Sequence, residues 1–257
     1  MTTEPEITIN ILGLLISVFI VISFPLILSF IWIKYKKGKF FAIISGVGGF
    51  IASVAIEGVI TYILSLLINK NSPLFYVITC ISPGLFEETG RYIFFKYILK
   101  NHNHVSTSVS YGIGHGGVES IFVGFSLIGY IIAKDSLIEK KIIKEDITFL
   151  TGLMSGIERI SSIGIQISLS VFVFKAVKEG KNKYYIAAIF LHDFVDFFAF
   201  LKAVGVINTI ILIESLIFVL CLLLSFIAYI IYKNMKEIVK DKGNKNEDDS
   251  SSPLKDN

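Results

Sequence analysis

The chain is poor in several residues on which small secreted or soluble proteins depend. Its 257 residues include two cysteines, one tryptophan and five prolines, and only 18% of them are Asp, Glu, Lys or Arg. Cys80 and Cys221 both lie inside apolar runs, which argues against a disulfide framework and leaves too few thiolates for a zinc site. Residues 1–6 contain no basic residue, so we expect a retained first span rather than a cleaved secretory signal.

Apolar residues are abundant instead. They make up 53% of the chain, with 22 Phe and 11 Tyr, and the mean hydropathy is +0.71. Repeated apolar runs of about 20 residues are typical of polytopic helical membrane proteins. We therefore expect an all-α transmembrane bundle of about seven spans. The predicted spans are 9–33, 40–68, 74–99, 106–133, 147–177, 184–204 and 207–232.

The placement of lysines predicts how the bundle lies in the membrane. Lysines gather after the first, third and fifth predicted spans and after residue 232, whereas the other loops carry few, apart from the mixed-charge loop 134–146. The positive-inside rule then places the N-terminus outside and the C-terminus inside. Residues 1–232 would form the transmembrane domain. Residues 233–257 are polar, charged and poor in aromatic residues, so we expect a disordered cytoplasmic tail.

Three predicted spans carry polar stripes where charges are costly, about 2.5 to 3.5 kcal/mol each on insertion scales. In each stripe an acidic residue and a basic residue lie four positions apart, so they share one helical face. All three stripes lie roughly 12 to 18 Å from the cytoplasmic ends of their helices, so we expect them to line one cavity. The residues of the stripes are Glu87, Glu88, Arg91, His115, Glu119, His192 and Asp196.

Other polar residues have simpler interpretations. Glu57, Glu158, Arg159 and Glu214 lie farther from the cytoplasmic ends, and we expect Arg159 to form a structural ion pair with Glu57 or Glu214. Gln166 returns to the depth of the histidines, where it either lines the site or forms an interhelical hydrogen bond.

Four glycines surround His115, at positions 112, 114, 116 and 117. They lie inside a predicted span and follow no strand, which argues against a phosphate-binding loop. They are expected to let a neighbouring helix approach closely or to make the helix irregular.

Carboxylates and imidazoles that converge in a membrane cavity suit three kinds of chemistry. A glutamate can take a proton from water while histidines stabilise an oxyanion. The same groups can relay protons or ions through a transporter. They can also hold a divalent metal such as zinc, for which His115, His192 and Glu88 are the candidate ligands. The residue types alone leave all three open.

The order of the motifs carries a resemblance. Glu-Glu-x-x-Arg, Gly-x-Gly-His-Gly-Gly-x-Glu and His-x-x-x-Asp, in this sequence, resemble the YhfC family of intramembrane proteases, which is similar to the CAAX-processing and bacteriocin-processing (ABI) group. The resemblance covers residues 40–232. It implies a bacterial membrane endopeptidase that hydrolyses a peptide or membrane-protein substrate. Glu87 or Glu88 would be the base, Arg91 would orient the glutamates, and His115 and His192 would assist. Glu119 and Asp196 complete the motifs.

Two features qualify this resemblance. Members of the family often carry a histidine where Gln166 stands here. The family has also been described both as metallo-type and as glutamic-type, and the absence of a His-Glu-x-x-His helix favours the glutamic type here. The expected partners are the substrate and the lipid bilayer, without nucleic acid. The alternative function is a non-proteolytic membrane protein, either a proton-coupled transporter or an immunity-type binding protein. A transporter would show an inverted repeat or interrupted half-helices, and neither is visible in the sequence.

Overall fold

The computed structural model describes residues 8–36, 38–140, 146–203, 206–207 and 209–250. Across these residues the fold is helical, and the one strand-like contact is an isolated bridge between Ile9 and Ile147. All seven predicted helices are present. Most of their ends lie within a few residues of the predicted ones, but α4 ends six residues later and α7 ends 18 residues later. The elements are α1 (Ile11–Lys36), α2 (Phe40–Leu67), α3 (Pro73–Ile93), η1 (Phe94–Ile98), α4 (Ser106–Glu139), α5 (Phe149–Glu179), α6 (Lys183–Ala203) and α7 (Ile210–Ser250).

Local sequence sets several of these ends. Ser72 precedes Pro73 and accepts a hydrogen bond from the Phe75 amide at 3.2 Å, so α3 begins with a side-chain cap and a proline in its first turn. Thr148 caps α5 in the same way. Helix α5 ends at Glu179 and is followed by Gly180, whose φ of 66° is the left-handed conformation that glycine adopts without a Cβ clash.

The last turn of the third predicted span is not α-helical. After Ile93 the chain forms the π-helical turn η1. This turn directs Phe95 into the core, where its ring lies 4.7 Å from that of Tyr111 and 5.2 Å from that of Phe174. The turn therefore holds α3 against α4 and α5 immediately after Arg91, the last residue of the polar stripe on this helix.

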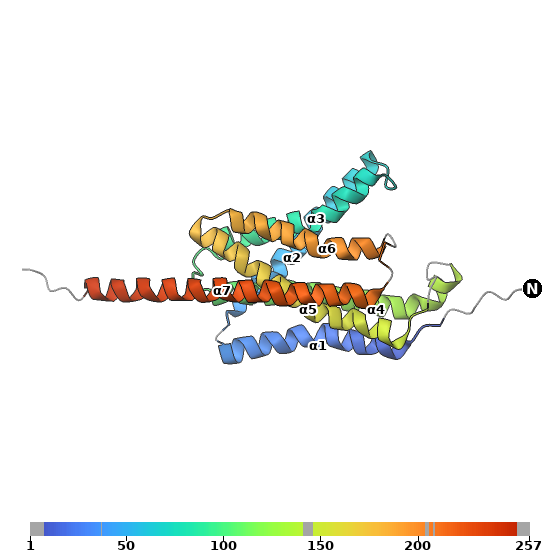
Figure 1. The fold of residues 1–257 in the computed structure, drawn as a ribbon, viewed down its shortest axis with the longest axis horizontal. Coiled ribbons are helices and arrows are strands. Elements are labelled where there is room, and N and C mark those ends of the chain that lie inside the picture. Colours follow the sequence, from blue (N-terminus) through green and yellow to red (C-terminus); the bar gives the residue numbers. More distant parts are fainter. Residues whose placement is uncertain (1–7, 37, 141–145, 204–205, 208, 251–257) are drawn as a thin grey trace, which may run out of the picture.

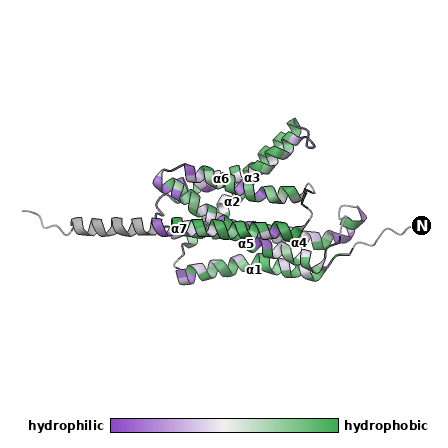
Figure 2. Cartoon of the chain, in the orientation of Figure 1, coloured by the Kyte–Doolittle hydropathy of each residue, from purple (hydrophilic) through white to green (hydrophobic). Residues whose placement is uncertain are grey.

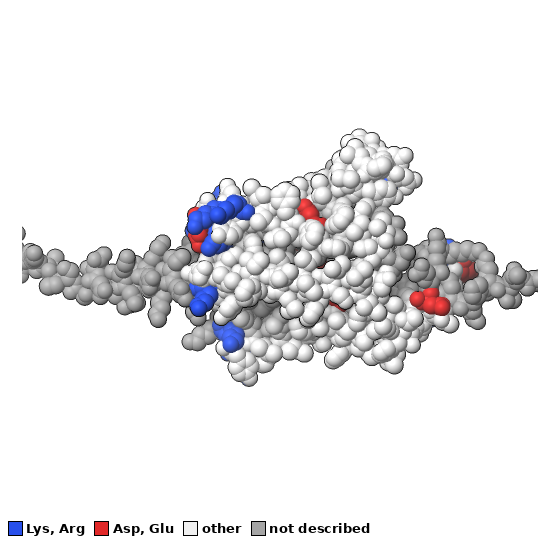
Figure 3. Space-filling model, viewed as in Figure 1, with Lys and Arg blue, Asp and Glu red and all other residues white. Residues whose placement is uncertain are grey.

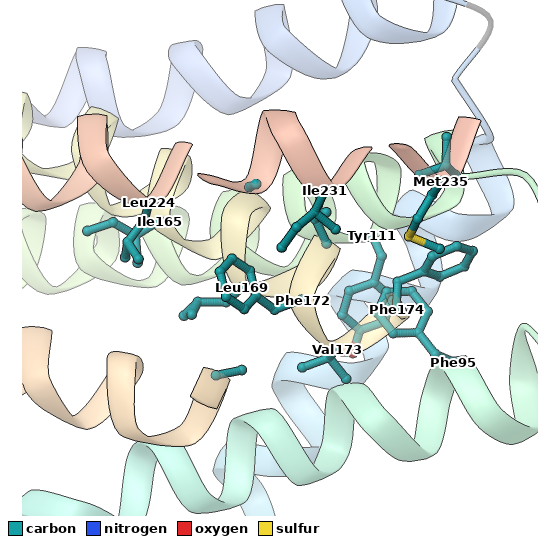
Figure 4. Close-up of a cluster of buried hydrophobic side chains, with 14 of the residues drawn as sticks. Phe95, Tyr111, Ile165, Leu169, Phe172, Val173, Phe174, Leu224, Ile231 and Met235 are labelled. Atoms are coloured by element: carbon teal, nitrogen blue, oxygen red, sulfur yellow. The ribbon is translucent and has the colours of Figure 1, made fainter. Parts of the chain in front are cut away.

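The bundle is arranged around α5, which packs against α1, α4, α6 and α7 (Figure 1). The α2–α3 hairpin joins from the other side, because α2 packs against α4 and α3 packs against α6. The tip of this hairpin extends away from the bundle (Figure 1). Figure 4 shows a cluster of buried apolar side chains between α5 and α7, in which Ile165 of α5 lies beside Leu224 of α7 and Phe174 of α5 lies near Met235 of α7.

Among the described residues, five helices are long and apolar enough to cross a membrane unaided: α1, α2, α4, α5 and the part of α7 up to Met235. The other two, α3 and α6, carry charged residues of the polar stripes. Hydrophobic residues make up most of the length of the helices, and hydrophilic residues gather toward the ends of the bundle (Figure 2). The chain is a multi-pass membrane protein.

The orientation in the membrane and the division of the chain at residue 232 stay predictions. Helix α7 continues through Ser250, so residues 233–250, for which composition predicts disorder, extend this helix beyond the bundle (Figure 1). Residues 1–7 of the predicted transmembrane domain and residues 251–257 of the predicted tail lie outside the described residues.

Glycines bring α2 and α4 into close contact, as expected from the cluster around His115. A Cβ on Gly114 would overlap the Ile43 carbonyl oxygen, and one on Gly46 would overlap the Tyr111 carbonyl oxygen. Helix α4 stays continuous through the cluster. The glycines therefore allow backbone contact between the two helices, which sets the position of His115.

We expect Gly114→Ala to lower the free energy of unfolding by about 1 to 3 kcal/mol, because the added methyl group forces α2 and α4 apart. Gly129→Ala, on the same helix, is the matched control, since a Cβ there meets no atom within 4 Å. Thermal unfolding of both variants in detergent checks this prediction. Equal stability of the two variants would contradict the close helix contact.

Candidate active site

The three predicted stripes meet at one buried site, so their residues lie at the same level along the bundle. Glu87, Glu88 and Arg91 come from α3, His115 from α4 and His192 from α6. Glu88, Arg91 and His115 have no exposed surface, and Glu87 retains 7%. Gln166 of α5 is also buried among them, so four helices contribute side chains to the site.

Glu88 is fully engaged by its neighbours. Arg91 donates from one nitrogen to both of its carboxylate oxygens, at 2.7 and 2.8 Å. The Nδ1 atom of His192 lies 2.8 Å from Glu88 Oε1. Because an ionised carboxylate only accepts hydrogen bonds, Nδ1 carries the proton in this contact. The Nε2 atom of His192 is therefore directed away from Glu88.

Arg91 also donates to the side-chain oxygen of Gln166. The amide nitrogen of Gln166 in turn donates to Glu119 at 2.8 Å and, more weakly, to Glu87 at 3.4 Å. Gln166 therefore connects the guanidinium group to two carboxylates, so it both lines the site and forms interhelical hydrogen bonds, the two interpretations that the sequence left open.

Glu87 differs from Glu88 in how many of its oxygens are used. Its Oε2 lies 2.9 Å from His115 Nε2 and receives the weak bond from Gln166. His192 Nε2 lies 3.8 Å from the same oxygen. Within the described residues no hydrogen bond ends at Glu87 Oε1. One carboxylate oxygen thus remains for a further partner.

Asp196 and Glu119 lie at the edge of this cluster. Asp196 Oδ2 is 3.6 Å from His192 Nε2, and its side chain is 36% exposed. Glu119 shares a helical face with His115, but its hydrogen bonds go to Gln166 and Arg159. A cavity of about 70 Å³ separates these residues, and its polar lining is Glu119, Glu158, Arg159, Ser162, Gln166, His192 and Asp196. At about 30 Å³ per molecule this volume holds roughly two waters.

The predicted ion pair between Arg159 and Glu57 is wrong. Arg159 donates to Glu119 at 2.9 Å and also binds its neighbour Glu158. Glu57 lies on α2, which packs against α3 and α4, and it accepts a hydrogen bond from Ser82 at 2.5 Å. The Glu214 alternative stays a prediction.

Sequence reasoning therefore missed that Arg159 and Glu158 reach the edge of the site. A signal was present, because Arg159, Ser162 and Gln166 are separated by three and four residues and so lie on one face of α5.

Comparisons with known proteins show the family of the chain. The family model described as YhfC intramembrane metalloprotease matches residues 18–217. The chain belongs to this family. It is also 30% identical over 207 residues to the uncharacterized membrane protein YhfC of Bacillus subtilis (strain 168), an alignment that covers 69% of this chain and 80% of the relative. No solved structure matches the chain significantly.

The family description implies a metal ion, so the side chains of the site are compared with the ligands that zinc requires. Two imidazoles and several carboxylates are ligand types that zinc accepts. Their placement does not suit it, because both Glu88 oxygens bind Arg91, and His115 Nε2 is hydrogen bonded to Glu87. No three His, Cys, Asp or Glu residues in the described part of the chain are positioned to hold a metal ion. The mechanism below therefore uses only the side chains.

We expect Arg91→Met to lower the free energy of unfolding by about 3 to 5 kcal/mol, because it leaves the fully buried Glu88 carboxylate without its cation. Lys134→Met removes the cation of the exposed Lys134–Asp135 pair and should change stability by less than about 1 kcal/mol. Thermal unfolding in the same detergent compares them. If both variants unfold at the wild-type temperature, the Arg91–Glu88 pair does not stabilise the site.

Proposed function

We propose that the chain is an intramembrane endopeptidase of a bacterial cytoplasmic membrane that hydrolyses a peptide or membrane-protein substrate, with Glu87 as general base. The observation that supports this assignment most is the difference between the two adjacent glutamates. Arg91 and His192 engage both oxygens of Glu88, whereas Glu87 keeps Oε1 without a hydrogen bond among the described residues.

In the first step Glu87 takes a proton from a water molecule as that water attacks the carbonyl carbon of the substrate. His115 and Gln166 hold the other carboxylate oxygen, which keeps Oε1 directed at the water. The attack forms a C–O bond and places negative charge on the carbonyl oxygen. In the second step the C–N bond breaks, and the proton on Glu87 passes to the departing amine.

His192 is suited to stabilise the oxyanion. Glu88 fixes the ring through Nδ1, so Nε2 lies toward Glu87 and Asp196. When His192 carries a proton on Nε2 as well as on Nδ1, Nε2 is a hydrogen-bond donor. A preorganised donor in a site without bulk water stabilises developing charge strongly. Arg91 then acts through Glu88, because it holds the carboxylate that positions the ring. We propose that Asp196 and Glu119 hold water in the adjoining cavity.

We expect Glu87→Gln to reduce the turnover rate by about 10² to 10⁴, since it removes the base, while the unfolding temperature stays close to that of wild type. Glu88→Gln should reduce both activity and unfolding temperature, because Arg91 and His192 lose their charged acceptor. Purified protein in detergent is assayed against a library of soluble and transmembrane peptides, with Asp135→Asn as a surface control.

The metal content of the same preparations is measured, and a chelator is added to one set of assays. Loss of cleavage on chelation, restored by zinc, would contradict a metal-independent Glu87 mechanism. Cleavage by Glu87→Gln at the wild-type rate would exclude Glu87 as the base. Absence of cleavage by folded wild-type protein would contradict the peptidase itself.

A further inference from the structure

A second cavity, of about 450 Å³, lies among α1, α4, α5 and α7. Its volume falls within the range of small-molecule binding sites. It is separate from the candidate active site. Ser168 lines it, and Ser168 is two residues from Gln166, so the two side chains are about 200° apart around α5. We call this cavity the α1–α7 groove.

Two helices form the walls of the groove. Trp32 and Lys36 lie one turn apart on α1, and Ser225, Tyr229 and Tyr232 share one face of α7 through spacings of four and three residues. Helix α5 provides the floor, because α1 and α7 each pack against it. The space between α1 and α7 is therefore open along the side of the bundle and backed by apolar side chains.

The charge in the groove is confined to one place. Lys36 is the sole charged residue in its lining, and it stands at the C-terminal end of α1. No carboxylate in the described residues pairs with it. The largest clusters of Lys and Arg visible in Figure 3 lie at this same end of the molecule.

Aromatic side chains frame the lysine. The indole nitrogen of Trp32 donates to Ser110 at 2.9 Å, which fixes the ring, while Tyr229 is 63% exposed. Tryptophan and tyrosine are enriched at the level of lipid headgroups, where one end of the side chain is apolar and the other is hydrated. An apolar trough that ends in aromatic residues and one unpaired lysine thus matches an amphipathic anion.

We propose that the α1–α7 groove binds one anionic phospholipid, with the headgroup phosphate at Lys36 and an acyl chain along the floor formed by α5. Basic pockets between membrane helices bind such headgroups, and Lys contributes both a charge and an apolar stem. The proposal does not depend on peptidase activity, because the groove shares no lining residue with the cavity of the candidate active site.

The test measures lipid binding to the full-length protein by native mass spectrometry, with palmitoyl-oleoyl phosphatidylglycerol and phosphatidylcholine as probes. Wild type should retain one phosphatidylglycerol, with at least about fivefold preference over phosphatidylcholine. Lys36→Ala should lower the affinity for phosphatidylglycerol by about fivefold. Ser225→Trp, which fills the groove, should reduce the binding of both lipids.

Lys34→Ala is the matched control, because Lys34 lies on the same turn of α1 but about 200° from Lys36, near Phe30 and Tyr35. The Lys34→Ala variant should bind phosphatidylglycerol with the affinity of wild type. Glycerol phosphate, which lacks acyl chains, should not displace the lipid. Equal loss in both lysine variants, equal binding of the two lipids, or displacement by glycerol phosphate would overturn the proposal. An unfolding temperature near that of wild type verifies that each variant is folded.

Discussion

The cost of placing charge in a bundle surrounded by hydrocarbon governs this structure. Arg91 and Glu88 have no exposed surface, and each compensates the charge of the other at 2.7 Å. The remaining donors of Arg91 require further acceptors, and Gln166 supplies one. Glu88 likewise accepts from His192. Satisfying one buried ion pair thus joins α3 to α5 and α6, because an unpaired polar group would cost several kcal/mol there.

The rigid part of the fold lies next to this ion pair and supports it. The glycines of α4 allow backbone contact with α2, and Phe95 of the π-helical turn packs against Tyr111 and Phe174. These contacts fix α3 and α4 relative to each other, so His115 meets Glu87 without mobile loops. The polar network and the apolar core are therefore one assembly. Of the two adjacent glutamates, only Glu87 keeps a carboxylate oxygen without a hydrogen bond among the described residues. His192 and Gln166, which contact Glu87, also line a cavity large enough for roughly two waters.

Much of this arrangement could be predicted from the sequence. Apolar runs predict the seven helices, since hydrocarbon thickness fixes the length of a span, but they do not predict that α7 continues to Ser250. Spacings of three and four residues predict the stripes, and helical rise predicts their common depth. Partner choice could not be predicted in the same way. Arg159 binds Glu119 because α4 packs against α5, and a sequence does not state which helices are neighbours. The different hydrogen bonding of Glu87 and Glu88 also required the structure, because adjacent residues point about 100° apart and either could face the site.

The central claim is that Glu87 activates a water molecule and does not itself attack the substrate. Single-turnover cleavage in water enriched in oxygen-18, followed by mass spectrometry of the products and of the protein, tests it most directly. A general base delivers the labelled oxygen to the new carboxyl terminus of the product and leaves Glu87 unlabelled. Label on the Glu87 carboxylate, with an unlabelled product, would show that this oxygen attacked the carbonyl carbon and would contradict the account.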